Sequence, residues 1–322
     1  MSQALFLGVD GGGTKTRFAL VDGVGTLLAE AQLGTTYHPQ VGLDGVRRIL
    51  GEGVGDVLAQ VQRNTGDIVQ AFFGLPAYGE DSRATATLQA IPAQVLGHDR
   101  YACDNDMVCG WAGSLACADG INIIAGTGSM GYGRRGVAAA RAGGWGEAFS
   151  DEGSAYWIAI QGLSAFSRMS DGRLPRGPLH ALLRAHFNLD DDLDICAHVY
   201  GEGVGTRGDL ARLSVQVAQA AREGDAVAIA IFERAGEELA TIADALRIAL
   251  GFETGETVPL SYSGGAFSAG ELLMQPFQTA LAATHGGFEL RTPLHAPHYG
   301  AALYALRLAG TRVEIPDSPD YL

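Results

Sequence analysis

Lysine is almost absent from this chain. Of its 22 basic residues all but Lys15 are arginine, and 36 acidic residues give the 322-residue chain a formal net charge of −14. A nucleic-acid partner needs a basic face, and an anionic membrane surface attracts basic clusters. The charge balance therefore argues against both partners. Anionic substrates must be bound locally, by loops, helix N-termini or Mg²⁺.

Long apolar runs and paired cysteines are also missing. No hydrophobic run reaches the length of about 20 residues that spans a membrane, and the start of the chain, Met1–Ala4, lacks the basic segment of a signal peptide. The four cysteines form no C-x-x-C motif, which disfavours a zinc or iron–sulfur site. We therefore expect free thiols and a cytoplasmic protein.

What the sequence does contain is a glycine-rich loop near its start. The apolar segment Leu5–Val9 predicts a strand that runs into Asp10, three glycines and a Thr-Lys-Thr triplet. Glycines such as Gly12 and Gly13 let backbone N–H groups approach an anion closely. Thr14 and Lys15 can then bind phosphate oxygens, and Asp10 at the strand end can hold a hydrated Mg²⁺.

This loop is neither a Walker A loop nor a dinucleotide fingerprint. Both the G-x-x-x-x-G-K-[ST] and the G-x-G-x-x-G spacings are absent, so a glycine-rich hairpin turn without a ligand is the alternative. The position of the only lysine favours a phosphate site, because the planar fork of arginine does not replace a compact ammonium there.

The pattern of this loop recurs later in the chain. Arg17–Asp22 and Leu27–Ala31 predict two further strands after the first loop, and hence an antiparallel meander. Ile121–Ala125 is again an apolar strand, and it ends in the glycine-hydroxyl segment Gly126–Ser129. We interpret the recurrence as duplication of a β-β-β-α-β-α unit. Two unrelated glycine hairpins are the alternative.

The recurrence also divides the chain. It predicts an N-terminal domain over residues 1–117 and a C-terminal domain over residues 118–322. Helical periodicity over about 176–252 predicts a helical insertion in the second domain. The last helix, expected over 298–308, is rich in alanine and glycine, so it can pack closely, including back on the N-terminal domain.

Two shorter segments of the second domain also carry structural signals. Ser150 or Asp151 is a suitable N-cap for a helix that runs to about Met169. Gly264 and Gly265 follow a predicted strand, and we expect a helix to begin near Ala269. A strand, a glycine pair and a helix N-terminus together favour nucleotide or anion binding.

Five motifs now stand in a fixed order, and together they resemble a known superfamily. The motifs are Asp10–Thr16, Asn105-Asp106, Gly126–Ser129, Ser263–Phe267 and Pro297–Ala302. They are similar to the phosphate-1, connect-1, phosphate-2, adenosine and connect-2 elements of the actin/hexokinase/Hsp70 ATPases. Within that superfamily, G-G-W-G followed by D-E-G-S-A-Y-W-I-A in Gly143–Ala159 resembles the N-acetylglucosamine kinase branch of the BadF/BadG/BcrA/BcrD ATPase family.

The resemblance implies both a fold and a set of ligands. The fold would be α/β, with duplicated ribonuclease-H-like domains around a central nucleotide cleft and extra helices in the second domain. ATP and Mg²⁺ would bind there together with an amino-sugar. A homodimer is expected from the family only.

The resemblance also implies the reacting groups. Asp106 would be the general base that takes the proton of the sugar hydroxyl, and Asp10 would hold Mg²⁺ through water. Asp104 is the alternative base if the register shifts by two residues. The simplest alternative for Asn105 or Asp106 is an ordinary helix N-cap.

Further residues would bind the nucleotide and the sugar. The phosphate ligands implied by the resemblance are Gly12, Gly13, Thr14, Lys15, Thr127, Gly128 and Ser129. Gly264 and Gly265 would pass under the adenosine. Asp151 would bind sugar hydroxyls in a pocket shaped by Trp145 and Gly146, with core packing as the alternative for Trp145.

The sequence departs from the family where the sugar would bind. N-acetylglucosamine kinases carry an asparagine in a pattern like S-T-N-H, whereas this chain has Thr35-Thr36-Tyr37-His38. Tyr37 or a neighbour such as His38 would then replace that ligand. The loop at Pro76-Ala77-Tyr78 also lacks the S-G-G of the family. The acceptor therefore stays open among N-acetylglucosamine, glucosamine, N-acetylmannosamine and other hexose derivatives.

The predicted activity is transfer of the γ-phosphoryl group of ATP to a hydroxyl of a hexosamine, with O6 as the first candidate. One rival is the redox-activator branch of the family, an ATPase that needs a cluster-ligating cysteine by the second glycine segment. Residues 118–146 contain no cysteine. The other rival is a sensor that binds sugar without turnover.

Overall fold

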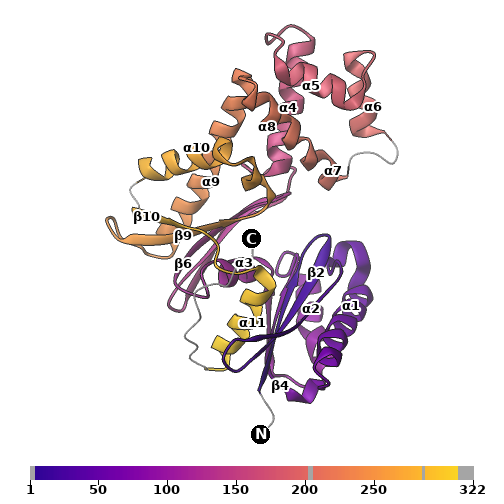
Figure 1. The fold of residues 1–322 in the computed structure, drawn as a ribbon, viewed down its shortest axis with the longest axis vertical. Coiled ribbons are helices and arrows are strands. Elements are labelled where there is room, and N and C mark those ends of the chain that lie inside the picture. The colour runs from indigo at the N-terminus through magenta and orange to yellow at the C-terminus, as the bar shows by residue number, and fades with distance from the viewer. Residues whose placement is uncertain (1–3, 202–205, 285–286, 311–322) are drawn as a thin grey trace. The chain divides into compact units, whose positions relative to one another are not determined.

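Two five-stranded mixed sheets organise the chain, one in each of two structural units (Figure 1). The structure is a computed structural model and describes residues 4–201, 206–284 and 287–310. Among the described residues, the first unit contains 4–119 together with 292–310, and the second contains those between Gly120 and Arg291. The C-terminal segment from Thr292 thus belongs with the N-terminal unit, and helix α11 (Pro297–Leu308) packs there on strand β1 (Leu5–Gly11).

The sheet of the first unit has the strand order β3-β2-β1-β4-β5. Its other strands are β2 (Lys15–Asp22), β3 (Leu27–Gly34), β4 (Ile68–Leu75) and β5 (Tyr101–Asn105). Strands β1 to β3 form the predicted antiparallel meander, and β4 and β5 join it in parallel. The carboxyl ends of β1, β4 and β5 therefore lie at one edge of this sheet.

Helices cover both faces of this sheet. Besides α11 they are α1 (His38–Gln60), α2 (Ser82–Leu96) and α3 (Met107–Ser114), with a 3₁₀ turn over Thr65–Asp67. Alternate residues of β1 point to opposite faces. Leu7 and Val9 join the core under α1, whereas Gly8 meets α11, where an added Cβ would lie 2.1 Å from the backbone nitrogen of Ala302.

The sheet of the second unit repeats the topology of the first. Its strands are β6 (Gly120–Ala125), β7 (Ser129–Arg135), β8 (Ala138–Gly143), β9 (Thr257–Ser263) and β10 (Gly287–Arg291). Their order is β10-β9-β6-β7-β8, with β6 to β8 antiparallel and β9 and β10 parallel to β6. Two sheets with the same connectivity confirm the predicted duplication of a ribonuclease-H-like unit.

The second unit carries more helices than the first. They are α4 (Ala155–Ser170), α5 (Pro178–Phe187), α6 (Ile195–Tyr200), α7 (Arg207–Arg212), α8 (Ser214–Arg222), α9 (Ala226–Ala249) and α10 (Glu271–Ala283), with 3₁₀ turns over Asp192–Asp194 and Gly265–Ala269. Helix α9 packs on β6, β7 and β8. Asp225 accepts hydrogen bonds from the first turn of α9 and, at 2.9 Å, from Leu179 N of α5, so one carboxylate joins two helices.

One local prediction for this unit was wrong. The N-cap of α4 is Ser154, whose Oγ accepts from Trp157 N, and neither Ser150 nor Asp151 has this role. Asp151 adopts a positive φ of 62°, which is incompatible with the extended conformation of an N-cap. The helix expected near Ala269 is present: the glycine pair leads into a 3₁₀ turn, and α10 begins at Glu271, directly after Gly270 with its φ of 69°.

Within residues 4–201, 206–284 and 287–310, no helix combines the length and the apolar character that a bilayer crossing requires.

Candidate active site

The predicted site residues fall into two groups, one in each unit. In the first unit, Asp10 to Thr16 form a tight hairpin between β1 and β2, which we call the first glycine hairpin. Asp10 pairs with Arg17 across the strands, and Gly12 N donates to Lys15 O at 2.8 Å. Gly13, Thr14 and Lys15 are exposed at the tip, so their N–H, hydroxyl and ammonium groups are accessible to an anion.

The loop that follows β3 supports this hairpin. Thr35 Oγ1 donates to Gly12 O at 2.7 Å, and Thr16 Oγ1 donates to Thr36 Oγ1 at 3.1 Å. Both threonines of the loop are buried. Tyr37 is 37% exposed, and His38 begins α1, so these two predicted sugar ligands lie directly beside the support of the first glycine hairpin.

The second chemical element of the first unit lies at the ends of β4 and β5. Gly74 of β4 pairs with Asp10 on one side and with Asp104 on the other. A Cβ added to Gly74 would lie 2.2 Å from Cys109 Sγ and 3.2 Å from the Cα of Asp106. This glycine therefore lets the start of α3, with Asp106, come close to the end of β1.

Asn105, and not Asp106, performs the capping role at the start of α3. Asn105 Oδ1 accepts from Met107 N at 3.2 Å, and its Nδ2 donates to Tyr78 O at 3.2 Å. The side chain of Asp106 makes no capping hydrogen bond. Asp104, the alternative base, is exposed and its Oδ1 accepts from Asn105 N at 2.7 Å. The carboxylate of Asp106 therefore has no capping role, and the charge of Asp10 acts on it.

Asp10 and Asp106 influence each other electrostatically. Burial raises the pKa of Asp10 to about 6, against the opposing charges of Arg17 and Lys15 and a hydrogen bond with Cys109. Burial also raises the pKa of Asp106 to about 7, and the negative charges of Asp10 and Glu80 raise it further. Two carboxylates with raised pKa values at one sheet edge are typical of a catalytic pair.

The second unit has a matching hairpin between β6 and β7. This second glycine hairpin, residues 125–129, closes with Gly126 N donating to Gly128 O at 2.8 Å. Its carbonyls accept from the first turn of α4, and Ser129 Oγ donates to Glu152 O at 2.6 Å. Thr127 is exposed at its tip, as Thr14 is in the first hairpin.

Asp151 lies against the second glycine hairpin. Its side chain is almost fully buried, it pairs with Arg207 of α7, and a Cβ added to Gly128 would lie 2.7 Å from its Oδ2. Burial raises the pKa of Asp151, the charge of Arg207 opposes that shift, and Glu147 adds to it. A non-glycine residue with positive φ at such a position is a feature of functional sites.

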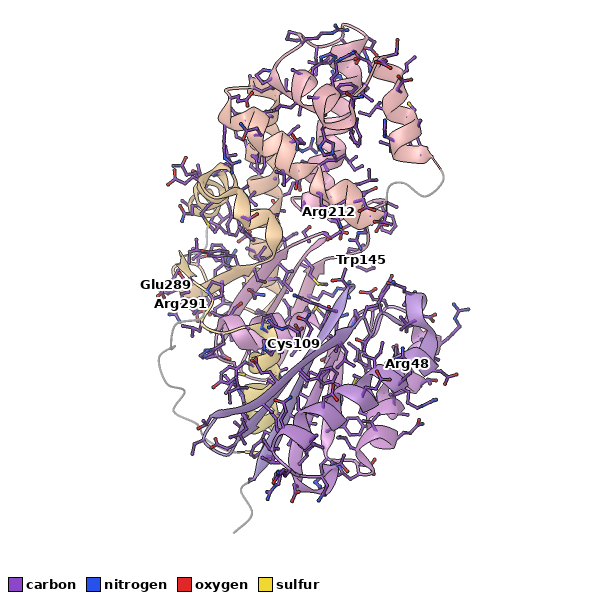
Figure 2. All side chains as sticks on the ribbon, turned by 45° about the vertical axis from the view of Figure 1, so that its right-hand side comes forward. Arg48, Cys109, Trp145, Arg212, Glu289 and Arg291 are labelled. Carbon is purple, nitrogen blue, oxygen red and sulfur yellow. The ribbon has the colours of Figure 1, made fainter. Side chains whose placement is uncertain are left out.

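Trp145 is 73% exposed, which excludes core packing as the reason for its presence (Figure 2). The neighbouring Gly146 adopts a φ of 101°, a conformation that favours glycine. We call residues 143–153 the acceptor segment. Within it Asp151 is buried and Trp145 points to solvent, so a ligand at Asp151 would have an exposed aromatic surface within the same segment.

The predicted adenosine turn lies against the end of β6. Gly264 has a φ of 104°, and an added Cβ would lie 2.4 Å from Ala125 O. Gly264 and Gly265 are exposed, and Asn122 Nδ2 donates to Ser263 Oγ at 3.3 Å beneath them. The backbone of this glycine pair is therefore exposed, without a covering side chain, next to the strand that leads into the second glycine hairpin.

The first unit has a donor set that suits Mg²⁺. The described residues contain no group of three or more His, Cys, Asp or Glu side chains arranged around a metal position. Mg²⁺ usually takes only one or two protein carboxylates and completes its shell with phosphate and water. Asp10, half-buried at a strand end next to the exposed tip of the first glycine hairpin, fits that requirement.

Three residues of these groups were not recognised from the sequence. Thr35 was noted only as part of a divergent loop, Cys109 as a free thiol, and Arg207 not at all. Arg207 lies 56 residues from Asp151, and no local spacing signals that they pair. For Thr35, its position directly after the third strand of the meander was the available signal.

Residues 7–305 match the BadF/BadG/BcrA/BcrD ATPase family. The chain belongs to this family. Its fold is the duplicated α/β fold of the actin-like ATPases and sugar kinases, as predicted.

Curated relatives extend over nearly the whole chain. An N-acetyl-D-glucosamine kinase from Dictyostelium discoideum is 28% identical over 316 residues, covering 95% of this chain and 99% of that protein. An N-acetylmuramic acid/N-acetylglucosamine kinase from Clostridium acetobutylicum is 27% identical and covers 93% and 97%. A glucosamine kinase from Vibrio cholerae is 24% identical over 73% of this chain and 77% of its own length.

Solved structures agree with this relationship. A protein from Chromobacterium violaceum, provisionally assigned as an N-acetylglucosamine kinase, superimposes with a TM-score of 0.74 at 26% identity, covering 95% of this chain and all of that one. A ROK-family glucokinase from Streptomyces griseus, solved with glucose and AMPPNP, shares the fold at a TM-score of 0.55 and 19% identity, over 94% of this chain.

Proposed function

We propose that this protein is an ATP-dependent hexosamine kinase, which transfers the γ-phosphoryl group of ATP to a hydroxyl of an amino-sugar, with O6 as the first candidate. The observation that carries the proposal is the carboxylate pair of the first unit. Asp10 ends β1 beside an exposed anion-binding hairpin, and Asp106 lies close to it at the start of α3.

The two carboxylates suit two different tasks. Asp106 would accept the proton of the sugar hydroxyl. Its pKa of about 7 is near the pH at which a general base works best. Asp10 would hold hydrated Mg²⁺, which supplies charge neutralisation for the phosphates when it is bound. The base is held in place without using its own carboxylate, because Asn105 supplies the cap of α3.

The exposed hairpins suit the phosphates. Phosphoryl transfer depends mainly on positioning and charge stabilisation. Gly12, Gly13, Thr14 and Lys15 would bind phosphate oxygens from the first unit. In the second unit the proposed phosphate ligands are Thr127, Gly128 and Ser129, and Gly264 and Gly265 would contact the adenosine.

Each unit contains candidate residues for binding the sugar. Asp151 would accept hydrogen bonds from sugar hydroxyls, with Trp145 and Gly146 forming the adjacent surface. Tyr37 and His38 stand where the family pattern has its asparagine, so they are the proposed determinants of which sugar is accepted. Three curated relatives act on N-acetylglucosamine, N-acetylmuramic acid or glucosamine by name, which supports an amino-sugar as the acceptor class.

A coupled assay of ADP release tests the proposal. The panel is N-acetylglucosamine, glucosamine, N-acetylmannosamine, N-acetylmuramic acid and glucose, each with ATP and Mg²⁺. We expect ADP release that depends on at least one hexosamine and exceeds the sugar-independent rate by orders of magnitude. Equal ADP release with and without every sugar would instead support an ATPase or a sensor, and would reject the kinase.

A further inference from the structure

Arg207 contacts two parts of the second unit that the proposed function uses. It is the first residue of α7, directly after the N-cap Thr206. Its guanidinium pairs with Asp151, and its Nε lies 3.3 Å from Glu147 Oε2. A Cβ added to Gly128 would lie 2.4 Å from the same guanidinium. One side chain of the helical insertion therefore touches both the acceptor segment and the second glycine hairpin.

Asp151 requires such a partner. Its side chain is about 3% exposed, and an ionised carboxylate is costly to bury without a compensating charge. Its backbone is held in the left-handed region, which a non-glycine residue adopts only where its surroundings fix it. Among the residues that the structure describes, the charge of Arg207 favours the Asp151 carboxylate and the charge of Glu147 opposes it.

The pair with Arg207 is compatible with binding of a sugar. Arg207 contacts Oδ2 of Asp151, and a carboxylate can accept about four hydrogen bonds in all. The side chain of Arg207 is about 41% exposed, so it remains accessible to solvent although its guanidinium pairs with Asp151. Its planar fork contacts two carboxylates at once, Asp151 through Nη2 and Glu147 through Nε, a geometry that the compact ammonium of lysine does not reproduce.

We propose that Arg207 is a positioning residue that holds the Asp151 carboxylate ionised and oriented toward the acceptor sugar, next to the second glycine hairpin. The sugar as acceptor rests on the proposed function, whereas the link between Arg207 and the ionisation of Asp151 does not.

Steady-state kinetics with the sugar that the wild type phosphorylates is the first test. In Arg207→Ala we expect the KM for the sugar to rise about tenfold or more, because a buried carboxylate loses its counter-charge. The KM for the sugar of Arg207→Lys should lie between the values for Arg207→Ala and the wild type. The matched control is Arg212→Ala on the same helix. The side chain of Arg212 is 79% exposed and pairs with Asp209 of the same helix. Its replacement should leave the KM for the sugar and the KM for ATP unchanged (Figure 2).

Chemical rescue separates positioning from a general loss of structure. Guanidinium chloride at low millimolar concentration should restore much of the sugar KM of Arg207→Ala, because the free cation can occupy the vacated position. It should not restore Asp151→Asn. A lowered melting temperature together with no rescue would assign Arg207 a purely structural role and overturn the proposal.

A measurement without catalysis completes the test. In protein labelled with ¹³C-carboxyl aspartate, the resonance of Asp151 is identified by its loss in Asp151→Asn. Its titration should move to higher pH in Arg207→Ala and stay in place in Arg212→Ala. A midpoint that does not move in Arg207→Ala, or an unchanged sugar KM, overturns the proposal. If the wild type phosphorylates no hexosamine, the proposed function fails, and the titration alone still decides the role of Arg207.

Discussion

The two units share one strand topology but differ in the charges near the ends of their strands. Burial raises the pKa of all three carboxylates, those of Asp10 and Asp106 in the first unit and that of Asp151 in the second. The charge of Asp10 raises the pKa of Asp106 further, whereas the charge of Arg207 opposes the shift of Asp151. Under the proposals above, the first arrangement would hold a carboxylate that can exchange a proton, and the second a carboxylate that accepts hydrogen bonds from the sugar.

The hairpins, by contrast, are built alike. Each is a glycine turn after an apolar strand, and each is tied to a neighbouring segment by a hydroxyl. The bonds are from Thr35 to Gly12 O in the first unit and from Ser129 to Glu152 O in the second. Under the proposed function, the two similar hairpins would both bind phosphates, and the residues that differ at the ends of the strands would carry the chemistry.

The largest expected effect comes from removing the base. Asp106→Asn should lower kcat by about 10³-fold, within the range for loss of a general base, while ATP binding stays intact. The measurements are ADP release and ATP affinity by calorimetry. Asp104→Asn is the control, because Asp104 is exposed and should retain most activity. Comparable loss in both variants, or activity retained in Asp106→Asn, would contradict the assignment.

The next largest expected effect is on stability, and it concerns α11, the C-terminal helix that packs in the first unit. A Cβ at Gly300 of α11 would lie 2.1 Å from Gly113 N of α3, and backbone cannot move aside as a side chain can. Gly300→Ala should therefore reduce the free energy of unfolding by about 3 kcal/mol or more.

Gly55→Ala is the matched control for this substitution. Gly55 is exposed within α1, and its added Cβ would meet no atom within 4 Å. It should stabilise the protein by up to about 1 kcal/mol, the difference in helix propensity. Denaturant unfolding of both variants checks the pair, and equal effects would mean that the close approach of α3 and α11 contributes little.

Stability against pH distinguishes the two carboxylate environments. Because the pKa of Asp106 is raised from 3.8 to about 7 in the folded protein, its contribution favours folding below pH 4 and is lost as the pH rises through about 7. In metal-free buffer Asp106→Asn should therefore stabilise the protein at pH 8, by on the order of 2 kcal/mol, and have little effect at pH 4. A gain that is equal at both pH values would show that Asp106 is not held protonated.

The smallest expected effects are those of the hydroxyls that support the hairpins. Ser129→Ala removes one hydrogen bond, and Thr35→Val removes the bond to Gly12 O together with the one that Thr35 Oγ1 accepts from Tyr37 N. Each such bond is worth about 1 kcal/mol. We expect a rise of about fivefold in the KM for ATP in each variant, with little change in the KM for the sugar. A change confined to one variant would show that the two hairpins do not share the task equally.

The repeated parts of this molecule could be predicted from the sequence, and the long-range pairs could not. An apolar strand followed by glycines and a hydroxyl marks each hairpin locally, so Asp10–Thr16 and Gly126–Ser129 were found directly. The role of Asp106 followed from the resemblance alone. Its closeness to Asp10 was not predicted, because the fold, and no sequence spacing, brings the start of α3 to the end of β1.

Other features depend on tertiary structure alone. Ser150 and Asp151 are good N-caps by residue type, yet Ser154 caps α4, since Asp151 is committed to Arg207 and to a left-handed backbone. The position of α11 in the first unit likewise depends on Gly8 and Gly113, which lie so close to the backbone of α11 and of the residues before it that a side chain would not fit. Helical periodicity in the sequence does not reveal such close approaches.

Phosphorus-31 NMR of the reaction products tests the central claim most directly. Wild-type protein with ATP, Mg²⁺ and the preferred hexosamine should yield ADP and a new phosphomonoester resonance coupled to the two protons on C6 of the sugar. The Asp106→Asn variant should yield neither within the same time, although it binds ATP. Inorganic phosphate as the only new product with every hexosamine would contradict the account.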